Sequence, residues 1–194
     1  MAALSEILIM LVRTATSLFL VAVLLRLLLQ LARADFYNPI SQFLVKVTNP
    51  LLKPLRRLIP GLLGIDMAAV LLAVLVQALG IAVVFLVNGL VPGVLQLLLW
   101  SLLGCVSTVV GIYFLAILAN IILSWVAAGS YHPAVILLHQ LTEPVMRPFR
   151  RLLPPLGGLD LSPILVFIVI NILQIALRHT ATAIGMPTAL VLGL

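Results

Sequence analysis

Four long stretches of apolar residues constrain this sequence more than any other feature. They cover residues 7–31, 67–87, 95–127 and 162–181. A helix needs about 20 predominantly apolar residues to cross the hydrocarbon core of a bilayer. Only 8% of the residues are charged, which is too few to cover a soluble domain of 194 residues. The sequence therefore predicts an all-α membrane protein with four transmembrane helices.

The third stretch is longer than the others, but we interpret it as a single span. Trp100 and Trp125 lie 25 positions apart near its two ends. That separation is about 37 Å along a helix, which fits a membrane together with its interfaces, where Trp is enriched.

An internal duplication organises the chain. Residues 37–66 align without a gap on residues 131–160, at an offset of 94 positions, and prolines, an Arg–Arg pair and an aspartate recur in register. We therefore predict two parallel-repeat helical hairpins. The first covers residues 1–91 with the connection 32–66, and the second covers residues 92–194 with the connection 128–161. Two spans separate the connections, so both connections must emerge on the same side of the membrane.

Each connection is proline-rich and amphipathic. Pro39 can begin a helix after Asn38, and one face of that helix would carry Ile40, Phe43, Leu44 and Val47. The second copy repeats this pattern with Ile136 and Leu137. We expect the prolines farther along to restrict continuous helix; these are Pro50, Pro54, Pro144 and Pro148.

Basic residues gather in and beside the connections, whereas the turn at residues 88–93 has no charge. The positive-inside rule therefore predicts cytoplasmic connections and periplasmic termini. A short apolar-faced helix beside cations is suited to lie on a membrane surface with the cations among anionic headgroups. The candidate lipid- or partner-binding residues are Lys53, Arg56, Arg57, Arg147, Arg150 and Arg151. The alternative is that these cations serve only topology and anchoring.

Three polar residues mark the starts of the second and fourth spans. Asp66 and Asp160 come just before these spans, where a carboxylate can cap exposed amides and oppose the helix dipole. Ser162, which precedes Pro163, adds a second start signal. We therefore expect Asp66, Asp160 and Ser162 to act as helix caps.

Several segments resemble the YggT family, which is also called YlmG. They are DFYNP at 35–39 leading to PLRRLIP at 54–60, and LTEP at 141–144 leading to RRLLP at 150–154 and GGLDLSP at 157–163. The resemblance implies a small bacterial inner-membrane protein built from two such repeats. It also implies an association with osmotic stress and potassium uptake, for some members with cell division, and for chloroplast relatives with haem attachment to a cytochrome or nucleoid organisation. It implies no catalytic residues.

The residues themselves point to no enzyme, cofactor or metal site. His132 and His139 lie in the second connection, but Asn38 and Val45 replace them in the first. One pair of histidines without a cysteine partner matches no tight metal site, and no Cys-x-x-Cys-His sequence is present for haem attachment. The basic clusters alternate with Leu and Pro close to the spans, which suits headgroups better than nucleic acid.

Four polar side chains lie in equivalent pairs inside the spans, Arg26 with Asn120 and Gln77 with Asn171. Gln77 and Asn171 would meet near mid-membrane if the halves pack about an axis along the membrane normal, and a hydrogen bond between helices is then the expected role. No Asp or Glu lies mid-span, so the common carboxylate cation site is missing. A channel for potassium or small solutes would need an oligomer, and it is the alternative to our preferred hypothesis. That hypothesis is a non-enzymatic membrane organiser that binds anionic lipid and a membrane or cell-division protein.

Overall fold

The computed structural model describes residues 2–126, 129–153 and 160–187, and within them it contains six helices and no strand. The helices are α1 (Ala2–Leu31), α2 (Pro39–Leu58), α3 (Met67–Val87), α4 (Val94–Val126), α5 (Pro133–Leu152) and α6 (Ser162–Ala183). Four of these helices, α1, α3, α4 and α6, are long and apolar enough to cross a membrane. The predicted all-α membrane fold with four spans is therefore confirmed.

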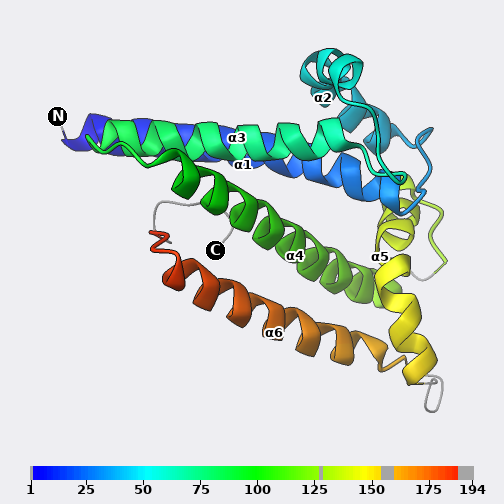
Figure 1. Cartoon of the computed structure of the whole chain (residues 1–194). Helices are drawn as coiled ribbons and strands as arrows, with labels where there is room; N and C mark the ends of the chain where they lie inside the picture. The colour runs from blue at the N-terminus through cyan, green and yellow to red at the C-terminus, as the bar shows by residue number, and fades with distance from the viewer. Residues whose placement is uncertain (1, 127–128, 154–159, 188–194) are drawn as a thin grey trace.

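The four long helices form an open row (Figure 1). α1 pairs with α3, both of these helices contact α4 across the junction of the two repeats, and α4 contacts α6. In the part of the chain that the structure describes, α6 touches neither α1 nor α3. The short helices α2 and α5 lie at the same end of the row, each against the two long helices of its own repeat (Figure 1). Both connections therefore emerge on one side, as the parallel repeat requires.

α1 and α3 form the tightest pair because a glycine lies between them. A Cβ atom on Gly80 would come within 2.5 Å of the Cγ2 atom of Thr16. In the second repeat Gln174 takes the place of Gly80, and α4 and α6 contact each other less extensively than α1 and α3 do. The closeness of α1 and α3 thus depends on a residue that the duplication did not preserve.

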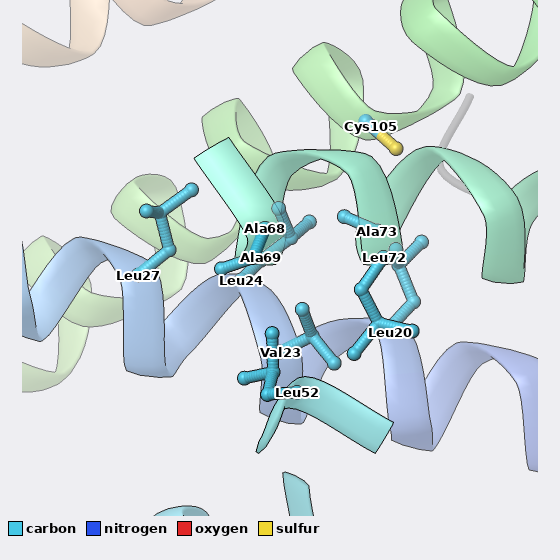
Figure 2. Close-up of a cluster of buried hydrophobic side chains, with 10 residues drawn as sticks. All are labelled: Leu20, Val23, Leu24, Leu27, Leu52, Ala68, Ala69, Leu72, Ala73 and Cys105. Atoms are coloured by element: carbon cyan, nitrogen blue, oxygen red, sulfur yellow. The ribbon is translucent and has the colours of Figure 1, made fainter. Parts of the chain in front are cut away.

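The largest buried cluster lies where α2 crosses α1 and α3 (Figure 2). Leu52 of α2 is fully buried there against leucines of α1 and alanines of α3. Small residues let the helices approach each other closely in the absence of a hydrophobic driving force between spans. The cluster consists of Leu20, Val23, Leu24, Leu27, Leu52, Ala68, Ala69, Leu72, Ala73 and Cys105.

Both short helices begin as the sequence predicts. Pro39 and Pro133 occupy first-turn positions, where the missing amide hydrogen costs nothing. The Asn38 side chain accepts a hydrogen bond from the Ile40 amide at 3.0 Å. The Nδ1 atom of His132 accepts one from the Ala134 amide at 3.2 Å. His132 is thus a helix cap in the second copy.

The prediction that internal prolines interrupt the connections is wrong. α2 continues through Pro50 and Pro54, and α5 continues through Pro144 and Pro148. Proline removes the hydrogen bond to the carbonyl four residues earlier. In α2 the carbonyls freed in this way belong to Lys46 and Pro50, which both lie on the exposed side of the helix. These carbonyl oxygens can accept hydrogen bonds from water or headgroups there, so the helix continues past both prolines.

Candidate functional site

The helix α2 presents three different faces. The first, around Leu44, Thr48 and Leu52, is buried against α1 and α3. The second, which includes Lys53 and Arg57, is polar and exposed. The third is an apolar stripe that stays exposed in the chain, with Ile40 at 39%, Phe43 at 62%, Val47 at 37% and Leu51 at 49% exposure. A helix lying in a membrane surface needs a protein face, a polar face and a lipid face of this kind.

The second copy does not repeat this arrangement, which corrects the prediction for Leu137. Leu137 and Leu141 take the places of Phe43 and Val47, but both are buried in α5. They pack in a cluster with Leu28, Leu29 and Ala116. α5 contacts α1 and α2 as well as the helices of its own repeat, and this cluster covers most of its apolar stripe. Ile136 remains 40% exposed.

Two hydrogen bonds join the beginnings of the two connections. The Asn38 Nδ2 atom donates to the Pro133 carbonyl at 2.7 Å. The Asp35 amide donates to the Gln140 Oε1 atom at 2.9 Å. α2 and α5 therefore form one surface at one end of the molecule, which we call the connection surface.

Each connection carries one arginine that binds the aspartate ten residues later. Arg56 donates through Nε and Nη2 to the Oδ2 atom of Asp66, with the Nε bond at 3.0 Å. Arg150 donates through Nε to Asp160 at 3.0 Å and through Nη1 to Glu143 at 2.7 Å. The recurrence of these residues in register was a signal for this pairing in the sequence. Two of the six candidate headgroup ligands are thus engaged inside the protein.

The other four candidate cations are exposed and carry no ion pair among the described residues. They also form two equivalent pairs in the duplication, because each lies 94 positions from its counterpart. We call them the free cations: Lys53, Arg57, Arg147 and Arg151.

The predicted caps differ between the repeats. Asp66 is the N-cap of α3 and accepts a hydrogen bond from the Ala69 amide at 3.2 Å. At the start of α6 the N-cap position belongs to Leu161, so Ser162 is the first helical residue instead of a cap. The Ser162 amide and hydroxyl both donate to Asp160. Asp160 therefore lies one residue before the N-cap of α6, whereas Asp66 is itself the N-cap of α3.

The electrostatics of Asp160 follow from these bonds. Partial burial on its own raises the pKa of the Asp160 carboxyl. The two hydrogen bonds from Ser162 and the neighbouring Arg150 outweigh burial, so the pKa lies below its ordinary value. Asp160 is thus held in its charged form.

Arg26 is buried in the first repeat, with 5% of its surface exposed. Its Nη1 atom donates to the Thr48 hydroxyl at 2.5 Å and to the Asn49 Oδ1 atom at 3.0 Å. Charged groups inside a span are expected to find such partners, because an isolated charge in hydrocarbon is costly. The partners come from α2, so this bond ties the connection to the span. Sequence reasoning did not find Thr48 and Asn49, although Thr48 recurs as Thr142.

Asn120 takes the place of Arg26 in the second repeat and lines a cavity of about 440 Å³. Asn120 is 92% buried, since 8% of its surface is exposed, and its Oδ1 atom has no hydrogen-bond partner among the described residues. The cavity lies between α4, α5 and α6, and its polar lining includes Ser124, His139, Arg150 and Asp160.

The expected meeting of Gln77 and Asn171 does not occur. Gln77 is fully buried, whereas Asn171 lies on the exposed side of α6. In the described residues α3 and α6 share no contact, because α4 separates them in the open row. The Asn171 Nδ2 atom donates to the Phe167 carbonyl of its own helix at 2.7 Å. The intramembrane polar groups therefore do not converge on a common path within one chain.

Among residues 2–126, 129–153 and 160–187, no group of three or more His, Cys, Asp or Glu side chains could hold a metal ion. Cys105 is buried in the core.

Comparisons with known proteins agree with the two-repeat structure. The family model described as CCB3/YggT matches residues 5–87 and again residues 99–181, so the two matches begin 94 residues apart. The uncharacterized protein PA0392 of Pseudomonas aeruginosa is 48% identical over 181 residues, which is 92% of each chain. The uncharacterized protein YggT of Escherichia coli K12 is 37% identical over 177 residues, or 90% of this chain and 91% of the relative.

A more distant relative comes from a plant. The YlmG homolog protein 2, chloroplastic, of Arabidopsis thaliana is 38% identical over 80 residues, or 41% of this chain and 29% of the relative. No solved structure matches the chain.

Proposed function

This chain belongs to the CCB3/YggT family, and we propose that it is a non-enzymatic protein of the bacterial inner membrane. In this proposal the connection surface lies at the cytoplasmic leaflet and binds anionic lipid headgroups. The protein organises the membrane in this way during adaptation to osmotic stress. The family resemblance supports the osmotic part of the proposal, and the geometry of α2 supports the lipid part.

The observation that carries the proposal is the exposed apolar stripe of α2 beside the free cations. Phe43 and Leu51 remain uncovered at the end of the spans, where a bilayer surface would meet them. Lys53 and Arg57 lie on the neighbouring face of the same helix. A helix in this position would insert its stripe at acyl depth and place its cations among phosphates.

The charge of the surface favours anionic lipids over neutral ones. Each Lys or Arg near an anionic leaflet contributes about 1 kcal/mol, so the four free cations together contribute about 4 kcal/mol. Arg56 and Arg150 contribute less, because their guanidinium groups already bind carboxylates. The proposal therefore assigns headgroup binding to the free cations and a structural role to the other two.

Retention of phosphatidylglycerol by the purified full-length chain tests the proposal. Native mass spectrometry counts the lipids that stay bound after extraction in a mild detergent. Replacing all four free cations by Gln should remove most of the bound phosphatidylglycerol and leave retained phosphatidylethanolamine unchanged. Equal retention by the native and four-Gln chains would refute headgroup binding.

Two double variants with the same loss of charge provide the control. Arg57→Gln with Arg151→Gln should reduce phosphatidylglycerol retention without lowering the melting temperature. Arg56→Gln with Arg150→Gln should lower the melting temperature, because it breaks the bonds to Asp66 and Asp160. If the variant with Arg57→Gln and Arg151→Gln kept its lipid but lost a co-purified membrane protein, the free cations would bind that protein instead of lipid.

A further inference from the structure

The two ends of the row of helices are formed by different helices, α1 and α6. The duplication indicates which packing partner each of these helices lacks. In the middle of the row, α3 of the first repeat packs against α4 of the second. By the 94-residue offset, α6 is the equivalent of α3, and α1 is the equivalent of α4. Among the described residues, the face of α6 that corresponds to the α3 face therefore has no helix packed against it, and the same holds for the face of α1 that corresponds to the α4 face.

Exposure of equivalent residues supports this interpretation. Ile81 and Cys105 are buried in the clusters around the α3–α4 junction, whereas their equivalents Ile175 and Leu11 are each 57% exposed. Gln77 of α3 is fully buried, but its equivalent Asn171 is exposed within an apolar span. Polar side chains in spans normally face the interior of a bundle. The exposed face of α6 thus has the character of an interior helix face.

The polar side chains at the two ends are complementary. Near the end of the row opposite the connections, Phe85 of α3 packs against Trp100 of α4, with ring centroids 5.4 Å apart. The equivalent residues at the free ends are His179 on α6 and Glu6 on α1. Both are exposed, and in the described part of one chain α1 and α6 do not touch. An aromatic pair inside the chain therefore corresponds to a base and an acid at its two ends.

We propose that copies of this chain associate head to tail in the membrane, with α6 of one copy packed against α1 of the next. His179 of the first copy then faces Glu6 of the second, in the position that Phe85 and Trp100 occupy within each chain. The interface is heterologous, because it joins two different surfaces, and repeated association gives a ring where the rotation between copies closes. It also covers Asn171 with protein. This inference does not depend on headgroup binding by the connections.

Cysteine cross-linking between differently tagged full-length copies tests the arrangement. One copy carries Glu6→Cys and the other carries His179→Cys, both are expressed in the same membrane, and a short bismaleimide is the probe. We expect a cross-linked species that contains both tags. Leu4→Cys is the matched control, because Leu4 is 72% exposed and its equivalent in α4, Leu98, remains 45% exposed outside the α3–α4 contact. Leu4 also lies at the level of Glu6 but about 160° around the helix from it. It should give several-fold less product with His179→Cys.

Charge reversal provides a second measurement, with assembly size followed by light scattering in detergent. Glu6→Lys should reduce the assembly to smaller species, and adding His179→Glu should restore it. The proposal is overturned if Glu6→Cys pairs with His179→Cys no better than Leu4→Cys does. It is equally overturned if copies that all carry Glu6→Cys cross-link to one another more efficiently, because that result indicates a symmetric interface.

Discussion

Arg56 and Asp66 are joined by two hydrogen bonds that bridge the loop between α2 and α3. The Asp66 side chain is 7% exposed, and it also caps α3 through the Ala69 amide. One carboxylate therefore fixes both the connection and the start of the following span. The equivalent pair, Arg150 and Asp160, has side chains that are 36% and 42% exposed.

Asp66→Asn should destabilise the protein more than Asp160→Asn. Loss of a hydrogen bond to a charged group costs about 2 kcal/mol at a buried site, whereas exposed ion pairs contribute about 0–1 kcal/mol. Thermal unfolding of both variants in the same detergent checks the order. Equal melting temperatures for the two variants would mean that burial does not distinguish the pairs.

Acid should weaken the contacts of Asp160 only below the ordinary pKa of an aspartate. Since the pKa of Asp160 is lowered in the folded state, the carboxylate contributes stability above its ordinary pKa, about 4. That contribution is lost as the pH falls from this value through the lowered pKa of the folded state. Trp125 lines the same cavity as Asp160, so its fluorescence in a Trp100→Phe background reports the change. Asp160→Asn should abolish the fluorescence transition, and a transition that persists in this variant belongs to another group.

Asn120→Arg should stabilise the second repeat. The new guanidinium would enter the cavity, and the equivalents of the two Arg26 partners are Thr142 and Glu143. A gain of about 1 kcal/mol corresponds to about 2–4 °C in melting temperature for a chain of this size. Asn120→Met is the control, because it fills space without charge. If both variants melt at the same temperature, the copied polar contacts do not form.

Gly80→Ala should lower stability, and Thr16→Ala should partly rescue it. The added Cβ would come within 2.5 Å of the Thr16 Cγ2 atom, so α1 and α3 must separate. Removing the Thr16 side chain beyond Cβ relieves this contact. Unfolding of the two single variants and the double variant gives the coupling between them. Purely additive effects would contradict a direct contact.

Single cysteines at positions 46 and 147 should react from the same side of the membrane. Lys46 lies on α2 and Arg147 on α5, and both residues are exposed at the end of the row that carries the connections. We expect membrane-impermeant maleimide to label both only after the cytoplasmic face is opened. Labelling of intact cells at either position would place the connections outside and would remove the headgroup proposal with them.

The sequence predicted the spans and the shared side of the connections because both depend on patterns within the chain. The lengths of the apolar stretches define α1, α3, α4 and α6. The 94-residue offset shows which helix of the first repeat corresponds to which helix of the second. The continuity of α2 through Pro50 was not predictable, since it depends on which carbonyls remain exposed. The burial of Leu137 was also hidden, because it requires α1 to reach α5 across the repeat boundary.

Some of the polar contacts were predictable from the sequence and others were not. The recurring Arg and Asp residues contained the information for their ion pairs, whereas Arg26 has lost its counterpart in the second copy. Its bonds to Thr48 and Asn49 depend on the crossing of α2 over α1, and no spacing in the sequence encodes that crossing.

The different surroundings of the two short helices make the connection surface asymmetric, because its α2 side exposes an apolar stripe and its α5 side does not. Phe43 is uncovered on α2, and its counterpart Leu137 is enclosed by neighbouring helices. In the proposed position at the leaflet, lateral tension would therefore pull on α2 through its apolar stripe, and through Arg26 on α1. α5 would meet the same leaflet only through Arg147 and Arg151, so the tension would reach its enclosed stripe through the neighbouring helices.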